Sequence, residues 1–262
     1  MLKRKFNFIS ILFIISFILL LAGCSTTKVV INNIEDLENS NIGIYTGSEY
    51  DRILEESTKN AKAVYYNSYS DEIAALKSGK IDGFLTDEPL GKEIVSNNNN
   101  LKILNEKLTT DSYAFAITPN KKSLKEKIDN VIIEMKKDGT LEKFENKWMG
   151  KDDSKKILDS YNNKKQTIKF ATVSGSAPFA YMKDNKIVGY DIDVINYIGN
   201  ELNYNVEIVE MSFEGIIPAL KSGKVDIAGC SIIVTEERKK SVLFSEPNYT
   251  GGIVVVVRDE KN

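Results

Sequence analysis

Two periodicities in hydrophobicity alternate along residues 34–118. Short apolar segments such as 41–45 and 63–66 have the length and composition of buried strands. Between them, 48–57 and 70–79 carry apolar residues at the three- and four-residue spacing of a helix. This alternation predicts an α/β domain at 34–118, with a mostly parallel sheet covered by helices.

The same alternation returns at 167–262, which we expect to be a second α/β domain. Helical segments at 119–150 lie between the two domains, and their apolar stripes are typical of core contacts. The polar, charge-rich stretch 151–166 is the best candidate for a linker.

A nine-residue sequence occurs almost unchanged in both domains. "ALKSGKIDG" covers 75–83 and "ALKSGKVDI" covers 219–227, which is 219 − 75 = 144 positions later. In each copy a helix is expected to end at the glycine, and a strand is expected to follow. We therefore predict one helix–glycine–strand module in each domain.

Residues 1–23 combine a basic start with a long apolar run, which is typical of a secretory signal. A transmembrane anchor is the alternative, because the run is close to the ~17–25 residues that span a bilayer. The end of the run, "LAGC", resembles the bacterial lipobox, which implies that Cys24 is acylated and becomes the new N-terminus. Residues 24–33 would then be a tether, and lipid would hold the protein on the outer face of the cell membrane.

The composition excludes several functional classes. The chain contains no histidine, which removes His-based nucleophilic and acid–base catalysis and most zinc sites. Without Lys3, Arg4 and Lys5 the net charge is about −2 − 3 = −5, and no basic stripe indicates nucleic-acid binding. Cys230 is the only cysteine besides Cys24, and its apolar neighbours predict a buried thiol. No cofactor and no metal are predicted.

Longer motifs in both domains are similar to those of one family. In the second domain they are "SAPFAYMKDNKIVGYDIDVINYIGNEL", the repeat and "TEERKKSVLFSEPNY". In the first domain they are "IEDLENSNIGIYTGSEYDRIL" and "YSDEIAALKSGKIDGFLTDEP". Together they resemble the polar-amino-acid-type extracellular solute-binding proteins of ABC transporters, family 3. The resemblance implies a two-lobe fold of the periplasmic-binding-protein type II class.

The order of the two domains is inverted relative to this family. Residues 167–262 resemble the family's first lobe, whereas 34–118 resemble its second lobe and 119–150 the helices that return to the first. This order implies a circularly permuted binding protein, an arrangement that close termini make tolerable. The alternative is a piece of a tandem array, in which each lobe needs a partner lobe.

The family binds an α-amino acid between its lobes, and the resemblance carries its site residues onto this chain. Arg238 matches the arginine that holds the ligand carboxylate through two parallel hydrogen bonds, with a surface arginine as the alternative. Asp87 matches the aspartate that accepts from the ligand ammonium, with a helix cap as the alternative. Phe213 and Ser231 match further contacts, with core packing as the alternative for Phe213. Ser48 opens a helix, where its hydroxyl and the free N–H groups favour an anion, with simple helix capping as the alternative.

Three positions depart from the family pattern. Glu49 replaces a common threonine, Ser176 replaces an aromatic residue before "APF", and Ile233 replaces a hydroxyl-bearing residue. Glu49 and Ser176 are still candidate ligand contacts, and Glu49 could act as an acceptor for a cationic ligand.

The sequence thus predicts a lipid-anchored protein that captures an amino acid, or a related amine or carboxylate, and delivers it to an ABC permease. A ligand sensor or accessory module with a degenerate cleft, or half of a tandem binding protein, is the alternative. An enzyme on this fold is the least favoured interpretation, because the chain has no histidine for acid–base catalysis.

Overall fold

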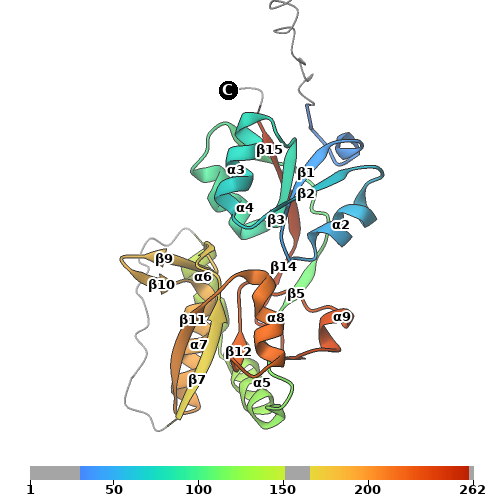
Figure 1. Ribbon diagram of the computed structural model, residues 1–262. Coiled ribbons are helices and arrows are strands. Elements are labelled where there is room, and N and C mark those ends of the chain that lie inside the picture. Colours follow the sequence, from blue (N-terminus) through green and yellow to red (C-terminus); the bar gives the residue numbers. More distant parts are fainter. Residues whose placement is uncertain (1–29, 151–165, 260–262) are drawn as a thin grey trace, which may run out of the picture.

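The computed structural model describes residues 30–150 and 166–259. They form two lobes, which are joined by the paired strands β5 (Asp111–Tyr113) and β14 (Tyr249–Gly251) (Figure 1). We call residues 30–110 and 252–259 the upper lobe, and residues 114–150 and 166–248 the lower lobe.

The upper lobe is a five-stranded mixed sheet in the order β2-β1-β3-β15-β4. β1 pairs in parallel with both β2 and β3, whereas β15 is antiparallel to its two neighbours. The strands are β1 (Asn41–Tyr45), β2 (Lys62–Tyr66), β3 (Gly83–Asp87), β4 (Leu101–Ile103) and β15 (Ile253–Arg258). The helices are η1 (Glu35–Leu37), α2 (Tyr50–Ser57), α3 (Tyr69–Ser78) and α4 (Glu88–Ser96).

Helices cover both faces of the upper sheet because β15 has apolar side chains on both sides. Val256 packs with residues of α3 and α4, while Val255 and Val257 pack on the opposite face with residues of α2. A strand that is buried on both faces reads as a continuous apolar run, as "VVVV" does here.

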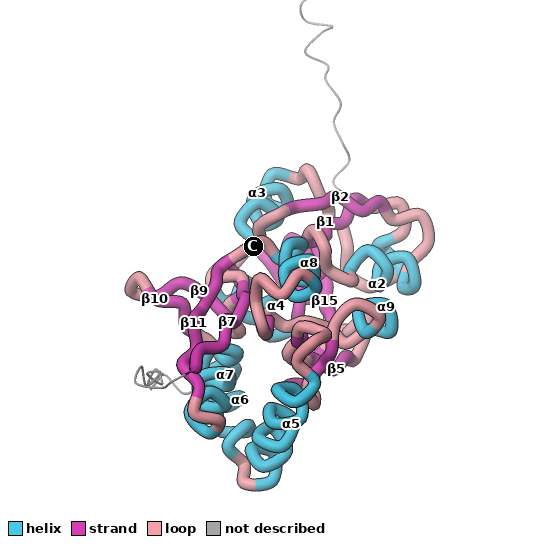
Figure 2. Tube along the Cα trace, turned by 60° about the horizontal axis from the view of Figure 1, so that its bottom comes forward, coloured by secondary structure: helices cyan, strands magenta, loops and turns pink. Residues whose placement is uncertain are grey.

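The lower lobe repeats this topology in the order β11-β7-β12-β6-β13, with an antiparallel fourth strand. Helices α5, α6 and α7 cover one face and α8 the other. The strands are β6 (Ala116–Ile117), β7 (Gln166–Thr172), β11 (Tyr204–Glu210), β12 (Ile227–Ala228) and β13 (Leu243–Phe244). The helices are α5 (Lys122–Lys137), α6 (Thr140–Met149), α7 (Tyr190–Glu201), α8 (Phe213–Lys221) and α9 (Glu236–Lys239). A small antiparallel sheet at its edge contains β8 (Gly175–Ser176), β9 (Ala180–Lys183) and β10 (Lys186–Val188) (Figure 2).

The predicted α/β class with two lobes is confirmed, but each lobe takes one strand from the other part of the chain. β15 belongs to the expected domain 167–262, yet it completes the upper sheet beside β3. β6 belongs to the expected domain 34–118, yet it completes the lower sheet beside β12. The expected boundaries therefore do not hold at these two strands, because a short apolar run fits the interior of either sheet equally well.

Both copies of the repeat form the predicted module. Gly79 follows α3 with φ 77°, and Gly223 lies just beyond α8 with φ 71°, so each occupies a left-handed position that glycine adopts at little cost. In the upper lobe the Asp82 carboxylate accepts a hydrogen bond from the backbone N–H of Asn41 at 2.9 Å. In the lower lobe, Asp226 accepts from the N–H of Lys169 at 2.8 Å.

Several expectations concern residues outside the described ranges. They are the signal peptide at 1–23, the lipidated Cys24 with most of its tether, and nearly all of the linker at 151–166. Among the helices of the described ranges, none combines the length and hydropathy needed to cross a membrane.

Candidate functional site

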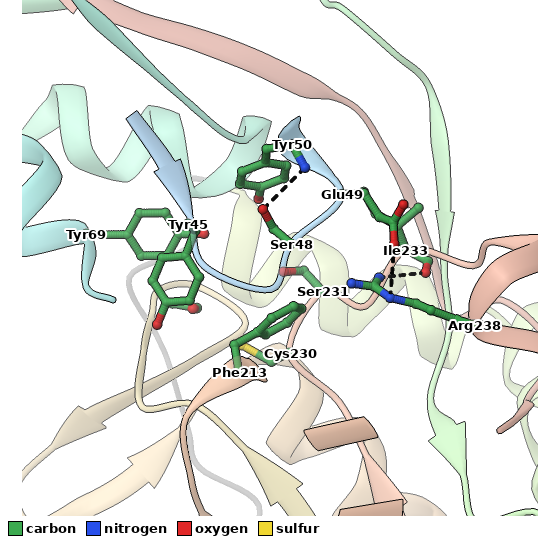
Figure 3. A pocket seen from close by; sticks show the side chains of 11 residues that line it. Tyr45, Ser48, Glu49, Tyr50, Tyr69, Phe213, Cys230, Ser231, Ile233 and Arg238 are labelled. Carbon is green, nitrogen blue, oxygen red and sulfur yellow. Dashed lines mark hydrogen bonds and ion pairs between the residues drawn. The ribbon is translucent and has the colours of Figure 1, made fainter. Parts of the chain in front are cut away.

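A small pocket lies between the two lobes, where loops of both converge (Figure 3). Its cavity has a volume of about 20 Å³. A single water molecule already needs about 10–15 Å³ of such a cavity, so an amino acid does not fit between the lobes as they stand. The lining residues are Tyr45, Ser48, Glu49, Tyr50, Tyr69, Ser176, Phe213, Cys230, Ser231, Ile233 and Arg238.

Arg238 supplies the positive charge of the pocket from the lower lobe. It lies in the short helix α9, which begins after Thr235, and its side chain is only 9% exposed. Nη1 donates to the backbone oxygen of Ile233 at 3.0 Å, and Nη2 donates across the gap to the oxygen of Gly47 at 3.1 Å. The guanidinium carbon lies 5.7 Å from the centre of the Phe213 ring. Burial lowers the pKa of Arg238, and the charge of Glu49 opposes this shift.

Glu49 supplies a negative charge opposite Arg238, from the upper lobe. Its Oε1 lies 3.3 Å from Nε of Arg238, and its Oε2 lies 3.3 Å from Nε of Arg52. The Glu49 side chain is 17% exposed, whereas Arg52 is 46% exposed and also pairs with Glu56 at 2.8 Å. The contact with Arg238 is therefore the less hydrated of the two ion pairs.

Asp87 is buried behind the pocket wall rather than lining it. It ends β3, and its side chain makes no capping bond to α4, so the helix-cap alternative does not hold. Instead, Tyr113 OH donates to Oδ1 and Ser231 Oγ donates to Oδ2, each at 2.7 Å. Burial raises the pKa of Asp87 to about 6, although these two hydrogen bonds oppose the shift.

Ser231 links carboxylates from the two lobes. Besides its hydroxyl bond to Asp87, its backbone N–H donates to Asp191 of α7 at 3.2 Å. Its φ of 46° is unusual for a residue with a side chain, and it turns the chain so that both bonds are made. Burial raises the pKa of Asp191 to about 7. Asp87 and Asp191 are thus both hydrogen-bonded to Ser231, which itself lines the pocket.

Aromatic rings form the remaining wall. The Tyr45 and Tyr69 rings stack with their centres 4.6 Å apart, and Phe213 meets Tyr45 edge-on at 6.1 Å. Tyr45 comes from the end of β1 and Tyr69 from the first turn of α3, so both belong to the upper lobe. These rings give the pocket an aromatic surface, although Ser176 replaces the aromatic residue that the family has at that position.

Six of the seven predicted ligand contacts line this pocket. They are Arg238, Ser48, Ser231, Phe213, Glu49 and Ser176, whereas Asp87 is one hydrogen bond behind the wall. Ser48 also accepts a hydrogen bond from the N–H of Tyr50 at 3.2 Å, which is a local capping role. Cys230 is buried as predicted, and burial raises the pKa of its thiol to about 12.

The sequence interpretation did not find Tyr45, Tyr50 or Tyr69. A signal for Tyr69 existed, since it stands 213 − 69 = 144 positions before Phe213 and so occupies the same place in the repeat. Tyr45 ends a parallel strand, and residues at the carboxyl ends of parallel strands are where α/β folds bind ligands.

Part of the lower-lobe sequence matches a known family. Residues 168–262 match the bacterial extracellular solute-binding proteins, family 3. The resemblance inferred from the sequence is thus confirmed for these residues, and a family of binding proteins agrees with the prediction that the chain is not an enzyme.

The family 3 relatives with established names are amino-acid-binding proteins. A probable histidine-binding protein of Campylobacter jejuni is 40% identical over 83 residues, which are 32% of this chain and 32% of that protein. The arginine-binding extracellular protein of Bacillus subtilis is 34% identical over 101 residues, which are 38% of this chain and 39% of that protein. The chain spans between 32% and 49% of the length of such relatives.

Solved structures of binding proteins also match. An ancestral arginine-binding protein bound to arginine has a TM-score of 0.32 and 42% identity, and the match covers 33% of this chain and 39% of that one. The ligand-binding component of an ABC-type import system from Staphylococcus aureus has a TM-score of 0.44 and 16% identity, covering 84% of this chain and 66% of that one.

Proposed function

We propose that the protein captures an α-amino acid between its lobes, with Arg238 holding the carboxylate and Asp87 accepting from the ammonium group. The observation that carries this proposal is that a buried arginine of the lower lobe lines the pocket, while a buried aspartate of the upper lobe lies directly behind Ser231 of the pocket wall. An α-amino acid needs a cation for its carboxylate and an acceptor for its ammonium group, and a site with little water strengthens both contacts. The names of the relatives, which bind arginine or histidine, support the same ligand class.

Ligand entry requires the lobes to separate. Both charged groups already have partners across the gap, since Ser231 donates to Asp87 and Arg238 donates to Gly47. The lobes are joined through β5 and β14, so a change of backbone angles there opens the pocket with little cost to either core. The described conformation is therefore a closed one, and the ligand replaces contacts that the protein makes with itself.

The wider role follows from the family and from the predicted lipobox. We propose that acylated Cys24 holds the protein at the outer face of the cell membrane, where it delivers ligand to an ABC permease. Two or more acyl chains are needed for stable membrane attachment, as the lipobox resemblance implies. Mass spectrometry of the mature protein tests the anchor, and an unmodified Cys24 would remove it.

We also propose that the two lobes are those of the family in permuted order. Both ends of the described chain reach the same strand, because Lys102 of β4 donates to Asn32 at 3.1 Å and also pairs with Val257. A chain joined at this point and opened at the linker would have the family order. A purified chain of monomeric mass with one ligand per molecule supports this proposal, whereas an obligate dimer with exchanged lobes contradicts it.

Isothermal titration calorimetry of the detergent-solubilised full chain against the twenty amino acids and small amines tests the ligand class. We expect saturable binding of at least one α-amino acid at one to one. If none binds, the accessory-module alternative is favoured.

A further inference from the structure

The pocket contains a carboxylate of the protein's own at the place where a ligand carboxylate would bind. Oε1 of Glu49 contacts Nε of Arg238 at 3.3 Å (Figure 3). Both Nη atoms donate to backbone oxygens, those of Ile233 and Gly47. A guanidinium has five N–H donors, and a two-bond contact with a carboxylate uses two neighbouring ones. Glu49 therefore takes the nitrogen through which a side-on contact would be made.

If a ligand displaces Glu49 from Arg238, the Glu49 carboxylate keeps one ion-pair partner, and the charge of that partner is already neutralised by another acid. Arg52 is that partner, and it makes contacts of 2.9 and 2.8 Å with the two oxygens of Glu56. A ligand carboxylate on Arg238 would also stand close to Glu49, and two like charges at short range repel. A ligand whose only positive charge is its α-ammonium group thus leaves the negative charge of Glu49 without a partner.

A ligand with a cationic side chain relieves this charge imbalance. Glu49 and Arg238 are the only charged residues lining the pocket among the described residues. A neutral amino acid adds one carboxylate and one ammonium group, which under the proposed function pair with Arg238 and Asp87, so Glu49 is left as one uncompensated negative charge. The rings of Tyr45, Tyr69 and Phe213 offer faces on which a guanidinium or ammonium group can lie. The wall thus has both an acceptor and a stacking surface for that cation.

We infer that Glu49 is an intramolecular competitor for Arg238, and that it makes the pocket select amino acids with a positively charged side chain over neutral ones. The inference rests on the proposed function, because it presupposes that Arg238 binds the ligand carboxylate. It assigns selectivity to a residue that departs from the family pattern rather than to one that follows it.

Two isosteric ligand pairs test the inference. Arginine and citrulline differ in side-chain charge but hardly in shape, as do lysine and 2-aminoheptanoic acid. Calorimetry of the full chain should show the cationic member of a pair binding at least about tenfold tighter. In Glu49→Gln the neutral member should gain about tenfold, so that the preference shrinks by about the same factor.

Glu55→Gln is the matched control. Glu55 is an exposed acid of the same helix, and the described ion pairs of Arg52 and Arg238 are made with Glu49 and Glu56 instead. This variant should keep the wild-type preference, and melting curves should show that both variants fold. If the wild type binds these ligands and Glu49→Gln leaves the preference unchanged, the inference is overturned while the proposed function stands. If none of the four ligands binds the wild type, the inference is overturned, and the titration with the twenty amino acids decides the proposed function separately.

Discussion

The upper and lower modules have the same scaffold but different groups at the pocket. Their sheets share one strand order, and their glycines and aspartates correspond at the 144-residue offset. Each aspartate also pairs with a cation at or beyond the end of the strand that crosses from the other part of the chain, since Asp82 pairs with Arg258, the last residue of β15, and Asp226 pairs with Lys121, which follows β6. The repeated aspartate therefore fixes the crossing strand in each lobe.

The corresponding pocket residues are less alike. Tyr69 corresponds to Phe213, and Asp87 corresponds to Ser231, since 231 − 87 = 144. This last pair meets across the gap, where the serine hydroxyl donates to the aspartate at 2.7 Å. Under the proposed function, one side would provide an acceptor for a ligand and the other a donor, which two identical lobes would not do. The scaffold positions are shared because they hold the fold, whereas the pocket positions would serve an asymmetric ligand.

Removing the upper aspartate should have the largest effect. Asp82 and Arg258 are 11% and 9% exposed, so Asp82→Ala leaves a buried guanidinium without this carboxylate. We expect a loss of about 3 kcal/mol in the free energy of unfolding, measured with urea and far-UV circular dichroism. Asp82→Asn, which keeps an acceptor for the Asn41 N–H, should lose less. Equal losses for the two variants would show that the ion pair does not contribute.

The two modules also differ at one buried position, where the upper helix has an acid and the lower helix has an apolar residue. Glu72 is fully buried in α3, and neither carboxylate oxygen has a hydrogen-bond partner, whereas the corresponding position of α8 is Ile216. Burial raises the pKa of Glu72 to about 9. Because the pKa in the folded protein lies above the unfolded value, ionisation favours unfolding, and stability falls as the pH rises from about 4.5 toward about 9.

We expect this acid to make the wild type about 3 kcal/mol less stable at pH 8 than at pH 5, as measured by urea unfolding. Glu72→Gln should remove most of that difference. Asp87 and Asp191 give a dependence of the same sign, so the measured quantity is the change between wild type and variant. An identical pH dependence in both proteins would contradict the assignment.

The lower aspartate should have the smallest effect. Lys121 is 39% exposed, so water screens its contact with Asp226, which measures 2.6 Å. Asp226→Ala should cost about 1 kcal/mol, mainly through the lost bond from the Lys169 N–H. The buried Trp148 of α6 reports on this lobe by fluorescence. If Asp226→Ala lost as much unfolding free energy as Asp82→Ala, the difference in burial between the two ion pairs would not explain their contributions to stability.

Local features of the fold were predictable from the sequence, whereas the crossing strands were not. The glycine at the end of each repeat helix has one physical reason, a left-handed turn, and it was identified correctly. The destination of β15 depends on which sheet lacks a strand, and no local pattern encodes that. The N-cap of α3 shows the same limit on a small scale, because Ser68 and Ser70 are both suitable and Ser68 accepts from Asp71.

The candidate site was predictable where a single residue type is required. Arginine at 238 and a carboxylate at 87 follow from the chemistry of an amino acid and from the resemblance. The contact between Glu49 and Arg238 was not foreseen, because it forms only when the lobes meet. The rings of Tyr45 and Tyr69 were also missed, since tyrosines near strands are common and carry no signal without the position of the cleft.

Calorimetric titration of arginine into the full-length wild type, Arg238→Ala and Arg238→Lys tests the central claim most directly. Arg238 should hold the ligand carboxylate, so Arg238→Ala should weaken binding by about 2–5 kcal/mol. Arg238→Lys should recover little, because a lysine cannot form two parallel hydrogen bonds. Saturable binding by the wild type with these two losses is the predicted result. An unchanged affinity in Arg238→Ala, or no binding by the wild type, would contradict it.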